Sequence, residues 1–109
     1  MNAAYTYIAD LNARLPEVPP ESIVSRGLPC DGPVKLTLFG FAPGQELSEH
    51  TSSRFAVLHI LAGEADVTLG DDAYPAQPGT FITMPPNLPH SIVAKTATTM
   101  LLIQVDDAG

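Results

Sequence analysis

The sequence predicts an all-β fold, either a sandwich or a closed barrel, and three observations lead to this prediction. From residue 22 onward the chain consists of short apolar stretches, several of which alternate with a period of two. Glycines and 11 prolines separate these stretches, as in proteins built of many short strands. The chain has 109 residues, of which 45% are hydrophobic, and this is enough for one domain with its own core.

The first 21 residues are expected to form a short helix followed by a linker. Pro16 ends the predicted helix, because the residue before a proline avoids the helical conformation. The stretch "PEVPP" then predicts a stiff linker, so residues 1–21 are assigned to helix and Pro-rich linker and residues 22–109 to the barrel. Four apolar residues recur in steps of four, three and four, which is helical spacing: Ala4, Ile8, Leu11 and Leu15.

The rest of the chain is expected to form about eight short strands, because period-two patterns or apolar runs end at turn residues. The "GDD" triplet between two of these runs predicts a hairpin. The run "FAVLHILAG" is apolar on both faces and predicts a strand that is buried on both sides. The stretches with strand character are 22–28, 34–42, 55–63, 64–70, 72–76, 80–84 and 98–105.

Alternation assigns side chains to the faces of the strand expected over residues 34–42. Leu36 and Leu38 fall on one face, and Lys35, Thr37, Phe39 and Phe41 fall on the other. We expect six apolar residues of the chain to fill the barrel rather than contact a cofactor. These are Phe39, Phe41, Leu58, Ile60, Phe81 and Met84.

Composition excludes several classes of partner. The net charge is −7 with only five Lys and Arg, so the clustered positive charge that binds nucleic acid or an anionic membrane surface is missing from the sequence. Apolar runs such as "MLLI" are too short to span a bilayer, and no secretory leader precedes the strands. Cys30 is the single cysteine and cannot form an intramolecular disulfide, so we expect a cytoplasmic protein.

Two stretches resemble the paired motifs of the cupin superfamily. In "PGQELSEH" Gly44 is followed after five residues by His50, and Gly63 in "LAGE" closes the first motif. In "GTFITMPPNLPH" Gly79 and His90 fall in register with the second motif, where "PPN" stands for the family's Pro-x-Gly. The closest resemblance is to small, stand-alone, single-domain cupins and covers about residues 22–105. It implies a double-stranded β-helix, the jelly-roll barrel, with inward-facing histidines and often a homodimer.

The sequence departs from the family at two of the four positions that usually bind metal. That site has three histidines and one glutamate; His50 and His90 are kept, whereas Ser52 and Ala56 replace the other histidine and the glutamate. Asparagine takes the place of the middle glycine of the second motif at position 87, and this exchange is mild because Asn tolerates positive φ.

The resemblance therefore predicts a barrel pocket lined by His50 and His90 that holds a divalent transition metal (Zn, Ni, Fe, Mn or Cu) and a small organic molecule. Waters, Glu46 or Glu49 would complete the metal shell. The alternative is a metal-free module that binds or senses a small molecule, in which the two histidines only line the pocket. The sequence leaves open whether the protein is an enzyme. Four further residues are expected in the pocket: Ser52, Ala56, Leu58 and Met84.

His59 and Arg54 each have two interpretations. Strand alternation turns His59 away from the side of Ala56, giving it a buried, hydrogen-bonded structural role, unless a β-bulge reverses the parity and makes it a ligand. Arg54 either belongs to a solvated turn or pairs with a substrate carboxylate.

A homodimer with a twofold interface is expected. The "FAVLHILAG" strand carries more apolar surface than one small barrel can cover, and a second copy of the chain would bury the excess.

Overall fold

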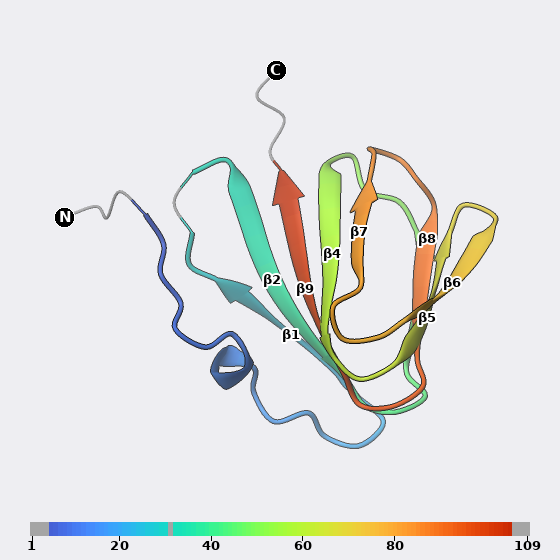
Figure 1. Ribbon diagram of the computed structural model, residues 1–109, viewed down its shortest axis with the longest axis horizontal. Coiled ribbons are helices and arrows are strands. Elements are labelled where there is room, and N and C mark those ends of the chain that lie inside the picture. The colour runs from blue at the N-terminus through green and yellow to red at the C-terminus, as the bar shows by residue number, and fades with distance from the viewer. Residues whose placement is uncertain (1–4, 31, 106–109) are drawn as a thin grey trace.

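Nine β-strands and one short 3-10 turn make up the computed structural model, which describes residues 5–30 and 32–105. The predicted all-β class is confirmed. The strands, shown in Figure 1, are β1 (Ile23–Leu28), β2 (Val34–Phe41), β3 (Glu46–His50), β4 (Phe55–Ala62), β5 (Ala65–Leu69), β6 (Asp72–Ala76), β7 (Phe81–Met84), β8 (His90–Ala94) and β9 (Thr98–Val105).

The strands form two antiparallel sheets that face each other. One sheet has the order β1-β2-β9-β4-β7 and the other the order β3-β8-β5-β6. The predicted hairpin at "GDD" joins β5 and β6, with Leu69 opposite Asp72. Figure 1 shows the strands of the larger sheet converging at one end and spreading at the other, where β7 and β9 end.

The main core fills the space between the two sheets. In β2, Phe39 and Phe41 point into this space, whereas Leu38 belongs to a second cluster, as the alternation predicted. From β4, Ala56, Leu58 and Ile60 enter the main core. The strand period of two thus divides the apolar residues of β2 and β4 between an inner and an outer face.

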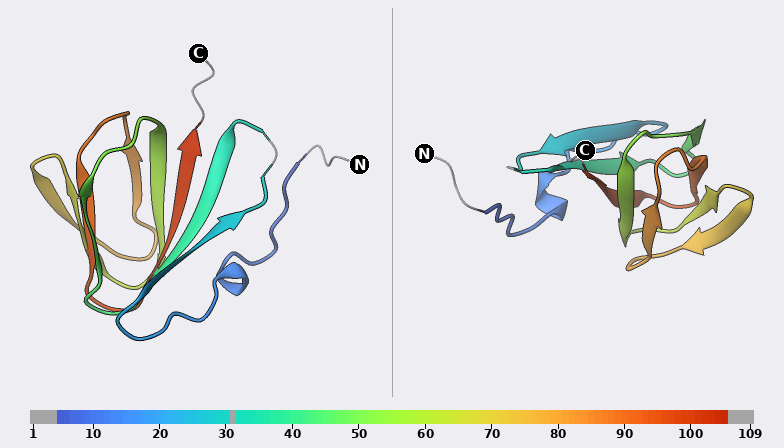
Figure 2. Two further views of the ribbon diagram at one scale, coloured as in Figure 1. Left: turned by 180° about the vertical axis from the view of Figure 1, so that it is seen from behind. Right: turned by 90° about the horizontal axis from the view of Figure 1, so that it is seen from above.

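The outer face of the larger sheet is partly covered by the N-terminal segment. Leu38 is fully buried there and Leu101 is 8% exposed. Both pack against apolar residues of the segment, which are Ile8, Leu11 and Leu15. Figure 2 shows this segment lying along β1 and β2 and away from the second sheet.

The predicted N-terminal helix is wrong in extent: from residue 5 to residue 21, helix is limited to η1, the 3-10 turn Asn12–Arg14. The Asn12 N–H donates to the side chain of Asp10 at 3.1 Å, and this local bond competes with a helical hydrogen bond. Leu15, before Pro16, is extended as predicted (φ −82°, ψ 127°). A segment of this length is a marginal helix on its own, so its apolar residues contact the sheet from a mostly extended chain. Ala4, the first of the four apolar residues with helical spacing, lies outside the described residues.

Two other features differ from the sequence prediction. Phe81 does not fill the barrel, because its side chain is 64% exposed on the outside of β7. Strands β3 and β8, which bear His50 and His90, were not assigned from the sequence. Polar residues dominate β3 ("ELSEH"), so its sequence lacks the apolar alternation that identifies a strand.

Within residues 5–30 and 32–105, no helix is both long and apolar enough to cross a membrane.

Candidate functional site: a two-histidine cavity

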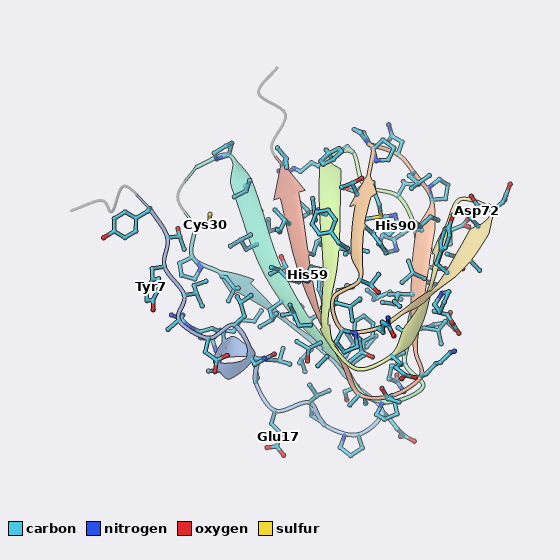
Figure 3. All side chains as sticks on the ribbon, viewed as in Figure 1. Tyr7, Glu17, Cys30, His59, Asp72 and His90 are labelled. Carbon is cyan, nitrogen blue, oxygen red and sulfur yellow. The ribbon has the colours of Figure 1, made fainter. Side chains whose placement is uncertain are left out.

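His50 and His90 lie directly opposite each other in the smaller sheet. His50 ends β3, His90 begins β8, and the two residues are register partners although 40 positions separate them in the sequence. Their ring centroids are 4.2 Å apart and the rings meet edge to face, with an interplanar angle of 61°. The barrel therefore brings together the two histidines selected from the sequence. Figure 3 shows His90 beside β8, at the wide end of the molecule.

A β-bulge in β3 turns His50 toward the interior. Leu47 pairs with Ile92 and His50 pairs with His90, so three residue steps along β3 correspond to two steps along β8. Strict alternation would place Leu47 and His50 on opposite faces of the strand. The extra residue restores the parity, and both side chains line the same inner cavity.

Each imidazole is held by the same local hydrogen bond. Nδ1 of His50 lies 2.8 Å from the carbonyl oxygen of Ser48, and Nδ1 of His90 lies 2.8 Å from that of Leu88. A carbonyl oxygen only accepts, so Nδ1 must carry the proton and donate it. In the neutral ring, Nε2 then holds a free lone pair. Both histidines are thereby fixed in the tautomer that can bind a metal or accept a proton through Nε2.

The two histidines line two adjoining cavities. The outer one has a volume of about 450 Å³ and also contains Ser52, Ala56 and Met84. The inner one, of about 50 Å³, is apolar and includes Leu58. The structure thus places all four predicted pocket residues beside the histidines. Another hollow, of about 380 Å³ between β6 and β7, is lined by Tyr74 and Phe81, and the Tyr74 phenol is the one ionisable group among the described residues that line it.

The loops that carry the two sequence motifs are bonded to each other. The backbone N–H of Asn87 donates to the carbonyl oxygen of Ser52 at 2.7 Å. Asn87 has φ 69°, as expected for a residue at a glycine position of the motif. The hydroxyl of Ser52 also accepts the backbone N–H of Arg54 at 3.2 Å. Of these two loops, the one after β3 forms a wall of the outer cavity, to which Ser52 and Arg54 both contribute.

His59 lies on the opposite face of β4 from the histidine cavity. Ala56 and Leu58 line the cavities, whereas the ring of His59 packs edge-on against Phe81, with centroids 6.3 Å apart. The irregularity of β4 falls between Ile60 and Ala62, beyond His59, so it does not reverse the parity. The ring is half-buried and the described residues give it no hydrogen-bond partner, so its predicted hydrogen-bonded role is not supported. Figure 3 labels His59 at the middle of β4.

Lys35 and Gln104 also line the outer cavity but were not selected from the sequence. They are register partners on β2 and β9. Alternation offered a clue for Lys35, because it shares a face with Phe39 and Phe41. The position of Gln104 depends on the pairing of β9 with its neighbours, which a single sequence does not give.

The type of donor atom at the site suits a metal ion, but the number of donors is too small. Two imidazoles with free Nε2 atoms suit a transition metal, whereas protein sites usually supply three or four ligands. Over the residues that the structure describes, no group of three or more His, Cys, Asp or Glu is arranged to hold an ion. Ser52 and Ala56 occupy the two positions where the motif has ligands, and neither side chain is a ligand of that kind.

A family model described as a cupin domain matches residues 37–106, which is more than half of the chain. The chain belongs to the cupin family. The matched residues include both of the stretches that carry His50 and His90. No curated protein matches the sequence.

Solved structures share the same cupin architecture. A conserved protein of unknown function from Streptococcus pyogenes is 29% identical with a TM-score of 0.82, covering 100% of this chain and 93% of that one. A cupin superfamily protein from Desulfitobacterium hafniense is 28% identical with a TM-score of 0.82, covering 96% and 100%. Salicylate 1,2-dioxygenase from Pseudoaminobacter salicylatoxidans is 13% identical with a TM-score of 0.73, covering 86% of this chain and 28% of that one, and shows the fold alone.

Proposed function

We propose that this cupin binds a small organic molecule in the histidine cavity, next to a divalent transition metal held by His50 and His90. The observation that supports the proposal is the matched pair of Nδ1–carbonyl hydrogen bonds, which presents two Nε2 lone pairs at one cavity. Fixing the second ring nitrogen of a ligating histidine is how metal sites orient their ligands. Water or the organic molecule would fill the remaining coordination positions. A bound metal would act as a Lewis acid toward that molecule.

The second candidate function is metal-free binding of a small molecule in the same cavity. The small, neutral side chains of Ser52 and Ala56 favour it, because they leave space where the family motif has ligands. Elemental analysis separates the two candidates. Protein purified without added metal and then offered Zn, Ni, Mn or Fe should retain close to one ion per chain after dialysis. Retention of none of the four would contradict the metal proposal and favour the metal-free module.

Restoring the two family ligands should strengthen metal binding. The variant Ser52→His/Ala56→Glu adds an imidazole and a carboxylate to the wall of the cavity that holds the histidines. We expect the dissociation constant for Zn to fall by at least about tenfold, because a four-ligand site replaces a two-ligand site. Competition titration against a chromogenic chelator measures the constant.

The matched control for that variant is Ser52→His/Val57→Glu, which keeps the added imidazole and moves the carboxylate one residue along β4, to the other face of the strand. It should lower the dissociation constant less than Ser52→His/Ala56→Glu does. Equal effects of the two glutamates would mean that general negative charge, and not ligation at position 56, attracts the metal.

We also propose that the chain forms a homodimer through the outer face of β4 and β7. Phe81 and Phe55 are 64% and 41% exposed there, beside the half-buried ring of His59. Light scattering at micromolar concentration should give twice the chain mass of 11.5 kDa. Phe81→Lys should shift the mass toward the monomer, whereas Tyr7→Lys, on the N-terminal segment, should not. A monomeric unmutated protein would contradict this proposal.

A further inference from the structure

Met84 lines the histidine cavity from the larger sheet. Two of the three methionines of the chain line the histidine cavities, Met84 the outer one and Met100 the inner one. Met84 is the last residue of β7 and the register partner of Ala56 in β4. Side chains of directly opposed residues on one face of a sheet start about 5 Å apart. The side chain of Met84 therefore begins beside the position where the family motif has its glutamate.

The outer cavity has room for the sulfur of Met84 to meet a metal ion. Its volume is about 450 Å³, and Ala56 contributes only a methyl group to the wall where the motif has a carboxylate. Methionine is unbranched and has three rotatable side-chain bonds, so its thioether adapts to an irregular space. Met84 is 2% exposed, so bulk water hardly competes with its sulfur for an ion. A thioether in this place can act as a third donor beside the two imidazoles.

A short, stiff loop joins Met84 to His90. Residues 85–89 have the sequence "PPNLP", and each of the three prolines fixes one backbone angle. The N–H of Asn87 bonds this loop to the one that follows β3, at 2.7 Å. The carbonyl oxygen of Leu88 accepts from Nδ1 of His90 at 2.8 Å. Donors that are already held in place lose less conformational entropy when they bind.

We propose that Met84 supplies the third protein ligand of the histidine cavity through its thioether sulfur, and that the resulting site binds Cu(I) in preference to Zn. The inference rests on the proposed function in taking His50 and His90 as ligands, and departs from it in the ion. Thioether ligands select the soft ion Cu(I), whereas Zn takes imidazole, thiolate and carboxylate ligands. Imidazole suits both ions, so the selectivity comes from the sulfur.

Paired dissociation constants test this selectivity. Metal-free protein is titrated under nitrogen with Cu(I) against a chromogenic Cu(I) chelator, and separately with Zn against a zinc chelator. Met84→Leu keeps nearly the same side-chain volume and removes the sulfur. It should raise the dissociation constant for Cu(I) at least about tenfold and leave that for Zn unchanged, because only the soft ion uses the thioether.

Met100→Leu is the matched control. Met100 is also 2% exposed, but it lines the inner cavity and pairs with Phe39 and Ile60, deeper in the core. The same exchange of thioether for isobutyl group there should leave both constants unchanged. His50→Ala, in contrast, should weaken the binding of both ions, because both use the imidazoles.

X-ray absorption at the copper edge detects the sulfur directly. The Cu(I) complex of the unmutated protein should show one sulfur neighbour together with imidazole nitrogens. The sulfur signal should disappear in Met84→Leu and persist in Met100→Leu. A purely structural role of Met84 in packing would not produce this signature.

Three outcomes would overturn the inference. They are a copper spectrum without sulfur in the unmutated protein, a sulfur signal that persists in Met84→Leu, and equal weakening of Cu(I) and Zn by that variant. Retention of Zn that depends on His50, with no sulfur around Cu(I), would contradict only this inference. Cu(I) bound with sulfur by a protein that retains none of Zn, Ni, Mn and Fe would contradict the divalent-metal proposal alone.

Discussion

Replacing either His50 or His90 by alanine is expected to abolish metal retention, whereas His59→Gln should leave it intact. His50 and His90 are register partners whose rings lie 4.2 Å apart and line the same cavities. If these are the two protein ligands, one remaining imidazole cannot hold the ion through dialysis. The metal content should therefore fall from near one ion per chain to less than about a tenth of that value. Elemental analysis of the three dialysed variants is the measurement.

His59→Gln serves as the control because it removes an imidazole from the other face of β4. Its expected cost is in stability alone, about 1 kcal/mol, from the lost ring contact with Phe81. If His59→Gln lost the metal while His50→Ala kept it, the assignment of the site to this cavity would be wrong.

Gly63→Ala should cause a large loss of stability, about 4 kcal/mol in the free energy of unfolding. Gly63 has φ +84°, a conformation that L-residues with a side chain rarely adopt. A Cβ there would collide with the carbonyl oxygen of Ala97 and lie 2.7 Å from Cα of Thr98. Both contacts are with backbone, of the β8–β9 turn and of the first residue of β9, which cannot move aside as a flexible side chain could. Urea denaturation measures the loss.

Gly44→Ala is the matched control for that prediction. Gly44 has nearly the same conformation, φ +83°, but no atom lies within 4 Å of the position that a Cβ would occupy there. This variant should lose only about 1 kcal/mol in the free energy of unfolding, the cost of holding an alanine at positive φ. The difference between the two variants isolates the close approach of the turn after β4 to the turn before β9. Equal losses would show that the backbone at Ala97 relaxes freely.

The sequence by itself determined the all-β class, the hairpin at "GDD" and the division of β2 into an inner and an outer face. These features depend on local chemistry, because alternation with a period of two and the residues preferred in turns are both read over a few positions. The motif glycines at positions 44, 63 and 79 all have positive φ, as does Asn87. The family resemblance also selected His50 and His90, which the fold brings together.

Contacts between distant residues determined the conformation of the N-terminal segment and the formation of the two histidine-bearing strands. Helical spacing in the segment was compatible with an extended chain, because Ile8, Leu11 and Leu15 pack against the outer face of the larger sheet from that chain. The segment β3 is polar, and its strand forms by pairing with β8. Local pattern carries little information where the partner strand supplies most of the stabilisation.

Only the tertiary structure decided the composition of the cavity wall. Lys35, Gln104 and Ala56 adjoin through the pairing of β2, β9 and β4, which are separated widely in the sequence. The bulge in β3 that turns His50 inward follows from its register with β8, and a single sequence does not encode a one-residue register shift in a visible way. Side-chain tautomers likewise depend on which carbonyl lies beside each Nδ1, and only the tertiary structure places Ser48 in β3 and Leu88 in the loop before β8 against these atoms.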